Sequence, residues 1–313
     1  MTFNFKNGDK IAGIGLGTWK AREGAAGFAV AEALKLGYKH IDCAAIYQNE
    51  EEIGEAFYNA FSNGIKREDV HITSKLWNNA HLAKDVEPAL KKTLNDLQLE
   101  YLDLYLMHWP VAIKPDVINA TQAEDYIPLN QAPLIETWEA MVELKKNGLV
   151  KHIGVSNFSV KKLKALMEKT DVIPEVNQIE LHPYLQQEEM FQFCKANDIL
   201  LTAYSPLGSL DRSAGMKRDD EPALMEDAKI IEIAKNHNAS PAQILIAWHI
   251  NRGNTVIPKS SNKERLAENL KAGDITLSND ELKAIQALDR HYRFITGKFF
   301  ELPGNGYENI YDE

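Results

Sequence analysis

The segment Gly13-Ile14-Gly15-Leu16-Gly17-Thr18-Trp19 decides between two folds that the rest of the chain allows. Its glycines are similar to the G-x-G-x-x-G fingerprint of an open, doubly wound dinucleotide-binding sheet. However, the third glycine has the wrong spacing, and the segment leads into Trp19 instead of directly into a helix. Along the chain, eight β-rich segments each precede a helical segment, without a central change in composition. This alternation favours closure into a (β/α)8 barrel.

Short β-rich runs and apolar residues at helical spacing place the expected elements. The strands are expected within residues 13–19, 40–42, 70–75, 102–108, 152–156, 176–180, 199–204 and 255–259. The first four helices are expected at about 25–37, 50–63, 85–97 and 134–147. Residues 2–5 and 10–12 flank an Asn7-Gly8 turn and are expected to form a β-hairpin plug. Residues 1–313 are therefore expected to form one α/β domain, a TIM barrel.

Two segments, residues 109–133 and 205–222, lack regular periodicity and follow the C-terminal ends of expected strands. Loops of this length are uncommon in compact domains unless they act as lids or binding loops. Barrels keep their active sites at that same face. The tail after Asp289 is rich in Phe and Tyr. We therefore expect it to pack as a C-terminal loop over the barrel mouth.

Composition excludes several classes of protein. The chain has 35 Lys and Arg against 45 Asp and Glu, a formal net charge of −10, and no run of basic residues. A nucleic-acid partner is therefore not expected. No apolar stretch is long enough to cross a membrane, and no apolar leader begins the chain. With only Cys43 and Cys194, we expect a cytoplasmic protein without a membrane partner.

Four polar residues near strand ends form the candidate catalytic group. Asp42, Lys75 and His108 lie at or near the ends of the second, third and fourth strands, and Tyr47 follows Asp42 by five residues. Singly, these residues are typical of an ion pair, a core histidine and a rim aromatic. Together they form a coherent acid, because an ammonium lowers the pKa of a nearby phenol and a carboxylate keeps that ammonium charged. A neutral His108 then orients a substrate carbonyl.

Several motifs resemble, in order, those of the aldo-keto reductase family, with the chain looking closest to aldose, xylose and aldehyde reductases. The likeness covers nearly the whole chain. The motifs that carry it are Gly15-Leu16-Gly17-Thr18-Trp19, Asp42 with Tyr47, Thr73-Ser74-Lys75-Leu76-Trp77, Met107-His108-Trp109-Pro110, Ile153-Gly154-Val155-Ser156-Asn157-Phe158, Asn177-Gln178-Ile179-Glu180, Ala203-Tyr204-Ser205-Pro206-Leu207 and Ile257-Pro258-Lys259-Ser260.

The resemblance implies a carbonyl reductase that uses NADPH, with NADH possible, and needs no metal. It implies that Tyr47 donates a proton and that Asp42 and Lys75 adjust the pKa of its hydroxyl. It also implies that His108 orients the substrate carbonyl. The resemblance implies that Ser156, Asn157 and Gln178 bind the nicotinamide carboxamide and that Tyr204 stacks on its ring. Further cofactor residues implied are Gly17, Thr18, Asp42, Ser205 and Leu207. Substrate-binding residues implied are Trp19, Tyr47, Trp77, His108 and Trp109.

The resemblance also implies a second site, which binds the adenosine half of the cofactor. Arg265, Glu268 and Asn269 share one face of the helix that follows Lys259-Ser260-Ser261-Asn262, and Ser260 or Asn262 could cap that helix. The resemblance implies that this helix N-terminus, flanked by Lys259 and Arg265, holds the 2′-phosphate of NADPH and that Glu268 and Asn269 contact adenine; Ser260 is also implied to bind the cofactor. Without the resemblance, the same residues are typical of an exposed charged helix face.

Aldehydes and open-chain aldoses are the expected substrates. The acidic run Glu50-Glu51-Glu52 after Tyr47 argues against sugar phosphates, although Lys298 could overturn that inference. The alternative is a non-catalytic regulatory or structural member of the same barrel family, which binds the cofactor without turnover. A barrel hydrolase using Asp42 or Glu180 lacks a second suitably placed carboxylate. The resemblance leaves monomer or dimer open.

Overall fold

Eight parallel strands form the centre of the computed structural model, which describes residues 1–21, 24–212 and 214–313. Their order is β12-β11-β10-β9-β6-β5-β4-β3, and parallel bridges from Ile14 to Val256 and from Gly17 to Lys259 join the two edge strands. The expected barrel is therefore confirmed. The strands are β3 (Leu16–Gly17), β4 (His40–Asp42), β5 (His71–Leu76), β6 (Leu102–Met107), β9 (Val150–Ser156), β10 (Val176–Glu180), β11 (Leu200–Tyr204) and β12 (Thr255–Val256).

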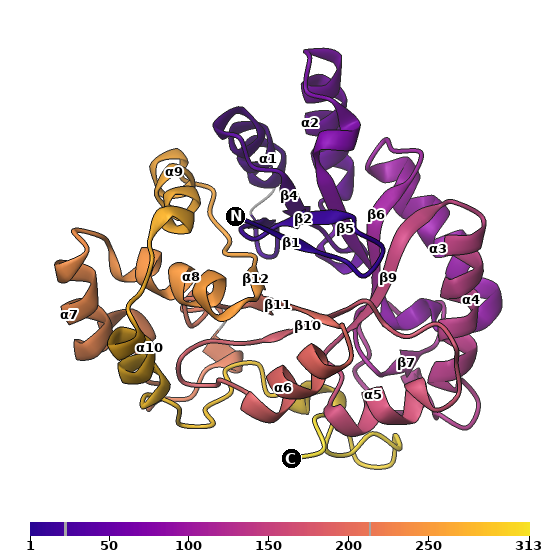
Figure 1. The fold of residues 1–313 in the computed structure, drawn as a ribbon. Coiled ribbons are helices and arrows are strands. Elements are labelled where there is room, and N and C mark those ends of the chain that lie inside the picture. Colours follow the sequence, from indigo (N-terminus) through magenta and orange to yellow (C-terminus); the bar gives the residue numbers. More distant parts are fainter. Residues whose placement is uncertain (22–23, 213) are drawn as a thin grey trace.

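The helices lie around the outside of these strands (Figure 1). They are α1 (Ala25–Leu36), α2 (Glu50–Ser62), α3 (Ala83–Asp96), α4 (Leu134–Lys146), α5 (Val160–Met167), α6 (Glu188–Ala196), α7 (Ala228–Asn236), α8 (Pro241–Arg252), α9 (Lys263–Lys271) and α10 (Asn279–Gln286). The larger apolar core lies between the strands and this helical layer, and it includes the fully buried Trp138 of α4. Amphipathic helices bury their apolar faces there because the sheet presents apolar side chains outward.

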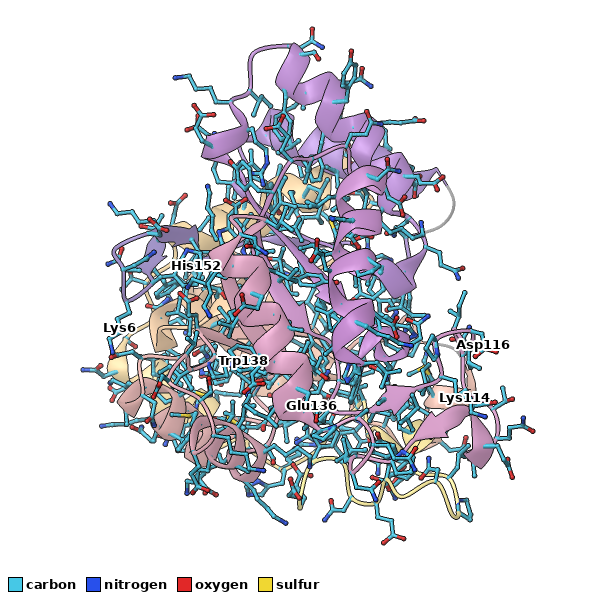
Figure 2. All side chains as sticks on the ribbon, turned by 90° about the vertical axis from the view of Figure 1, so that its right-hand side faces the viewer. Lys6, Lys114, Asp116, Glu136, Trp138 and His152 are labelled. Atoms are coloured by element: carbon cyan, nitrogen blue, oxygen red, sulfur yellow. The ribbon has the colours of Figure 1, made fainter. Side chains whose placement is uncertain are left out.

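The N-terminal hairpin closes one end of the barrel. Strands β1 (Thr2–Asn4) and β2 (Lys10–Ala12) pair in antiparallel fashion. Phe5 and Ile11 pack with Leu104, Leu106 and Val176, so the plug that the sequence predicts is present. Figure 2 shows Lys6 and His152 at this side of the molecule, with Lys114 and Asp116 at the opposite side.

The closure of the barrel depends on a close backbone approach at Gly17. A Cβ atom there would lie 2.7 Å from the carbonyl oxygen of Ile257, which precedes Pro258 after β12. Only glycine allows β3 and the segment after β12 to come this close. Gly17, which the resemblance lists among the cofactor residues, is therefore also required by the packing of the barrel itself.

The two long segments at the other end are more ordered than the sequence indicates. Residues 109–133 contain an antiparallel pair, β7 (Ala112–Ile113) and β8 (Tyr126–Ile127). Residues 205–222 contain a short 3-10 turn, Ala214–Met216. The tail packs Phe300, Tyr307 and Ile310 into an apolar cluster with Trp109, so it lies over this end of the barrel as expected. Within the described ranges, no helix is both long and apolar enough to cross a membrane.

Candidate functional site

Asp42, Tyr47, Lys75 and His108 come together at the C-terminal end of the barrel strands. The Lys75 Nζ donates to the Asp42 carboxylate, to the carbonyl oxygen of Cys43 at 2.9 Å and to the Tyr47 hydroxyl at 3.5 Å. The rings of Tyr47 and His108 meet edge to face with their centroids 5.9 Å apart. The parallel strands cause this convergence, because their C-terminal ends all open at one face.

Asp42 is held from several directions. The Gln178 Nε2 donates to its Oδ2 at 2.7 Å, while the Thr18 hydroxyl donates to its backbone carbonyl at 2.8 Å. Both oxygens of this buried carboxylate therefore accept a hydrogen bond, one from Lys75 and one from Gln178. A buried carboxylate needs such partners because burial without them is costly.

Burial controls the protonation of the candidate acid. Burial would lower the pKa of Lys75, but Asp42 beside it outweighs this effect and the pKa is raised. Burial raises the pKa of Tyr47 to about 12, against the lowering that Lys75 exerts. Lys75 does lower this pKa, as the sequence indicates. Desolvation of the enclosed phenolate, which the sequence does not reveal, exceeds the attraction of the ammonium, so the pKa lies above its ordinary value in the protein alone.

His108 is neutral at physiological pH. Burial lowers its pKa well below the ordinary value, and the charge of Lys75 adds to the effect. Its Nδ1 is buried without a hydrogen-bond partner among the described residues. A neutral imidazole carries one donor nitrogen, which is the group that a carbonyl oxygen requires.

A cavity of about 700 Å³ opens beside these side chains. Asp42, Tyr47 and His108 line it, whereas Lys75 is fully buried beneath them. Most of the residues that the sequence singles out line it too: Gly17, Thr18, Trp19, Trp77, Trp109, Ser156, Asn157, Gln178, Tyr204, Ser205, Leu207, Lys259, Ser260 and Arg265. Glu268 and Asn269 do not line it; Glu268 is exposed and Asn269 is buried.

Amide and hydroxyl groups occupy the middle of this cavity. The Tyr204 hydroxyl donates to Asn157 Oδ1 at 2.6 Å, and the Asn157 Nδ2 donates to the His108 carbonyl at 3.0 Å. The Ser156 hydroxyl donates to the Gln178 carbonyl at 2.8 Å. Asn157 has a φ of 63°, a left-handed conformation that asparagine tolerates better than most residues. These contacts fix the side chains of β9, β10 and β11 relative to one another.

Cations gather at one end of the cavity, next to the start of α9. Asn262 caps this helix by accepting the Arg265 N–H at 2.8 Å, which settles the choice between Ser260 and Asn262. The Lys259 Nζ lies 3.1 Å from an Asp211 carboxylate oxygen, so the segment after β11 reaches across to this end. A capped helix start flanked by Lys259 and Arg265 is suited to an anion.

Sequence reasoning missed two charged residues here, Lys20 and Asp211. Burial lowers the pKa of Lys20 to about 8, while Asp211 raises it. The Lys20 Nζ also lies 3.8 Å from the Trp19 ring centroid. Neither residue belongs to a motif of fixed spacing. For Asp211 the signal in the sequence was the unusual length of residues 205–222, a segment that does not contain Lys20.

Aromatic side chains around Trp109 and Phe299 form another part of the cavity lining, which we call the aromatic end. The Trp109 ring meets Phe299 edge to face with centroids 5.6 Å apart, and the Trp77 Nε1 donates to the Ile118 carbonyl at 2.8 Å. Ile295 and Phe299 of the tail line the cavity here. Among the described residues, no cluster of three or more His, Cys, Asp or Glu side chains could hold a metal ion.

Comparison with known proteins agrees with this geometry. A sequence model described as the Aldo/keto reductase family matches residues 13–290. An aldo/keto reductase of Synechocystis sp. is 52% identical over 99% of this chain and 96% of its own length. The aldo-keto reductase family 1 member A1 of Homo sapiens is 46% identical, and that of Mus musculus 45%, each over 92% of this chain and 89% of its own length.

Proposed function

Because the chain belongs to the aldo/keto reductase family, we propose that it catalyses the NADPH-dependent reduction of aldehydes or open-chain aldoses to alcohols. At the coarser level, the chain is an NAD(P)H-dependent oxidoreductase that reduces small carbonyl compounds. The observation that carries the finer proposal is the placement of Tyr47, with Lys75 and Asp42 behind it, in a cavity that extends to the cationic start of α9.

The residues present fit a nicotinamide dinucleotide. Its carboxamide needs both donors and acceptors, which Ser156, Asn157 and Gln178 offer at the centre of the cavity. The Tyr204 side chain offers an aromatic face for the nicotinamide ring. Lys259 and Arg265 offer positive charge for phosphate. When bound, the nicotinamide supplies a hydride to the carbonyl carbon.

The side chains of this protein donate the proton and orient the carbonyl oxygen. With a pKa of about 12 before any ligand binds, Tyr47 holds its proton at neutral pH and can donate it from Oη to the developing alkoxide. The neutral His108 donates a hydrogen bond to the same oxygen and sets its direction. The charge of Lys75 stabilises the phenolate that remains, and Asp42 keeps that charge in place.

The preference for NADPH rests on charge at the far end. Lys259 and Arg265 lie where a 2′-phosphate would be met by cations as well as by the N-terminus of α9. Glu268 and Asn269, which the resemblance assigns to adenine, follow Arg265 on α9 but lie outside the cavity lining, so a contact with adenine would be made beyond the cavity. NADH lacks the 2′-phosphate, so it would use only the remaining contacts.

The substrate class follows from the aromatic end of the cavity. Apolar walls beside Tyr47 and His108, which both face the carbonyl oxygen, favour an aldehyde with an apolar body. An open-chain aldose offers the same carbonyl group and stays in the proposal on that ground alone. The acidic residues after Tyr47 do not face the substrate cavity, so they give no reason to exclude sugar phosphates. Glu50 points away, accepting from the Ser74 hydroxyl at 2.5 Å, and neither Glu51 nor Glu52 lines the cavity.

Residues 1–313 are proposed to act as one domain in a reducing compartment, the cytoplasm. The buried free thiols of Cys43 and Cys194 support the choice of compartment. The test of the function is to mix the protein with NADPH and a panel of aldehydes and aldoses, and to follow the near-ultraviolet absorbance of NADPH. Loss of absorbance with at least one carbonyl is expected. Binding of NADPH without turnover of any of them would favour a regulatory or structural role instead.

A further inference from the structure

A buried carboxylate fixes the start of the C-terminal tail. Glu180, the last residue of β10, is 0% exposed. Its Oε1 accepts the Phe294 N–H and its Oε2 accepts the Ile295 N–H, both at 2.7 Å. The His182 Nε2 lies 2.8 Å from the same Oε1. Three donors thus meet on one carboxylate, although it lies more than a hundred residues from the tail.

The same stretch of tail is held from its other side by the segment after β11. The Arg212 Nη1 donates to the Phe294 carbonyl at 2.5 Å, and Arg212 also pairs with Glu221 at 2.5 Å. The Arg212 side chain is fully buried. The backbone of Phe294 is therefore fixed between the end of β10 and the segment that reaches over the cavity.

The fixed residues lead directly into the wall of the cavity. Ile295 and Phe299 line the aromatic end, and Phe299 contacts Trp109 edge to face. The Tyr311 hydroxyl donates to the Ile295 carbonyl at 3.0 Å, which ties the end of the tail to the same residue. A shift of the Ile295 backbone would therefore move the wall while leaving Tyr47 and His108 in place.

We infer that Glu180 is a positioning residue for substrate recognition, which sets the Ile295–Phe299 wall through its two backbone hydrogen bonds to the tail. This inference rests on the carbonyl reductase function proposed above. Glu180 does not touch the substrate; it acts through Phe294 and Ile295. Glu180 is therefore expected to affect substrate specificity. A substrate that fills the aromatic end contacts this wall, whereas a small aldehyde does not.

The chemistry requires a carboxylate and not its amide. An ionised carboxylate is an acceptor at both oxygens, so each tail N–H finds a partner. In Glu180→Gln the NH₂ group would oppose one of the donors and leave it unpaired in a dry site. Glu180→Asp keeps both acceptors but is shorter by one methylene, so it is expected to weaken the same bonds to a lesser degree.

Other contacts hold the rest of the tail, so the substitution is local. The Tyr307 hydroxyl donates to the Ile127 carbonyl at 2.6 Å, and the Lys162 Nζ lies 2.5 Å from an Asp312 oxygen. Asp312 offers a matched control, because Asp312→Asn also removes a carboxylate that tethers the tail but lies away from the cavity lining.

The experiment compares wild type, Glu180→Gln, Glu180→Asp and Asp312→Asn. Amide hydrogen exchange of Phe294 and Ile295 is measured on the protein without cofactor, and kcat and KM are measured for propionaldehyde and 4-nitrobenzaldehyde. Glu180→Gln is expected to speed exchange at both amides by at least about tenfold. It is expected to raise KM for the aromatic aldehyde about tenfold, with kcat and the KM for propionaldehyde near wild type. Glu180→Asp should lie between, and Asp312→Asn should match wild type.

Unchanged exchange in Glu180→Gln would overturn the inference, as would an equal change in KM for both aldehydes or the same change in Asp312→Asn. If Glu180→Gln does not fold, as judged by circular dichroism, Glu180→Asp decides on the same criteria. A wild-type protein that reduces neither aldehyde would refute the proposed function. The exchange rates would then still decide, on their own, whether Glu180 anchors the tail.

Discussion

The Lys75 ammonium and the Tyr47 hydroxyl lie 3.5 Å apart, and the ammonium makes closer contacts with the Asp42 carboxylate and the Cys43 carbonyl. The positive charge is thus neutralised first by Asp42. Burial of the phenol then outweighs the remaining attraction, and the pKa of Tyr47 is raised to about 12. The pair holds a proton ready instead of releasing it, which suits a group that donates as negative charge develops on a substrate oxygen.

Replacement of Tyr47 by Phe tests this role directly. The variant keeps the ring and its packing against His108 but loses the proton. We expect kcat for aldehyde reduction to fall about a thousandfold, within the range for loss of a general acid. NADPH affinity, measured by quenching of protein fluorescence, should stay near the wild-type value. Turnover close to wild type would refute the assignment of Tyr47 as proton donor.

Replacement of Lys259 by Met tests the cofactor preference. Loss of a charged partner of phosphate is expected to raise the KM for NADPH by about tenfold to a hundredfold and to leave the KM for NADH nearly unchanged. Lys263→Met is the matched control, because Lys263 starts the same helix but pairs with Glu32 outside the cavity. Equal effects on both cofactors, or an equal effect in the control, would contradict a 2′-phosphate site here.

Buried histidines are expected to weaken the fold in acid. Burial lowers the pKa of His40, His71 and His249 below the ordinary value, so the folded state binds fewer protons than the unfolded chain. Their contribution to stability is present above about pH 6.5 and is lost as the pH falls through the folded pKa values. Urea unfolding at a series of pH values should show the free energy of unfolding falling below about pH 6.5.

His249→Leu measures the contribution of one buried histidine to the loss of stability in acid. Both ring nitrogens of His249 are buried without a partner among the described residues. The variant should therefore lose less stability than wild type as the pH falls below about 6.5. A variant with the same acid dependence as wild type would show that this histidine does not contribute.

Glu50 is expected to have the opposite pH dependence. Burial raises its pKa to about 7, although hydrogen bonds from Ser74 and Thr93 lower it. The folded state therefore binds an extra proton between the unfolded and folded pKa values, and stability from this group is lost as the pH rises through that window. Relative to wild type, Glu50→Gln should become more stable by about 3 kcal/mol between pH 4.5 and pH 8.

The measurement is urea unfolding of both proteins across this range. The exposed neighbour Glu51 supplies the control, because Glu51→Gln alters the same helix turn without changing a buried group. Glu51→Gln measures the effect of removing an acidic side chain from this turn, and the gain of Glu50→Gln is read relative to it. A difference between Glu50→Gln and wild type that stays constant with pH would mean that Glu50 titrates alike in the folded and unfolded states.

The sequence alone was sufficient to predict the barrel and most of the residues that line the cavity. Alternation of β-rich and helical segments is a local pattern, and it predicts parallel pairing because a helix must connect such strands. Asp42, Lys75 and His108 could be placed at one mouth because strand ends share a face. The motifs that resemble the family then allowed the cofactor residues to be predicted beside these strand ends.

Tertiary structure decided the features that depend on burial and on partners distant in the chain. The pKa of Tyr47 rises instead of falling, Glu50 turns away from the cavity, and Asp211 reaches Lys259 from a segment without periodicity. Glu180 looked like a strand-end carboxylate and proves to hold the tail. Desolvation and long-range pairing sum contributions from many segments, so no local pattern of residues encodes them; only the packed chain fixes which charge meets which donor.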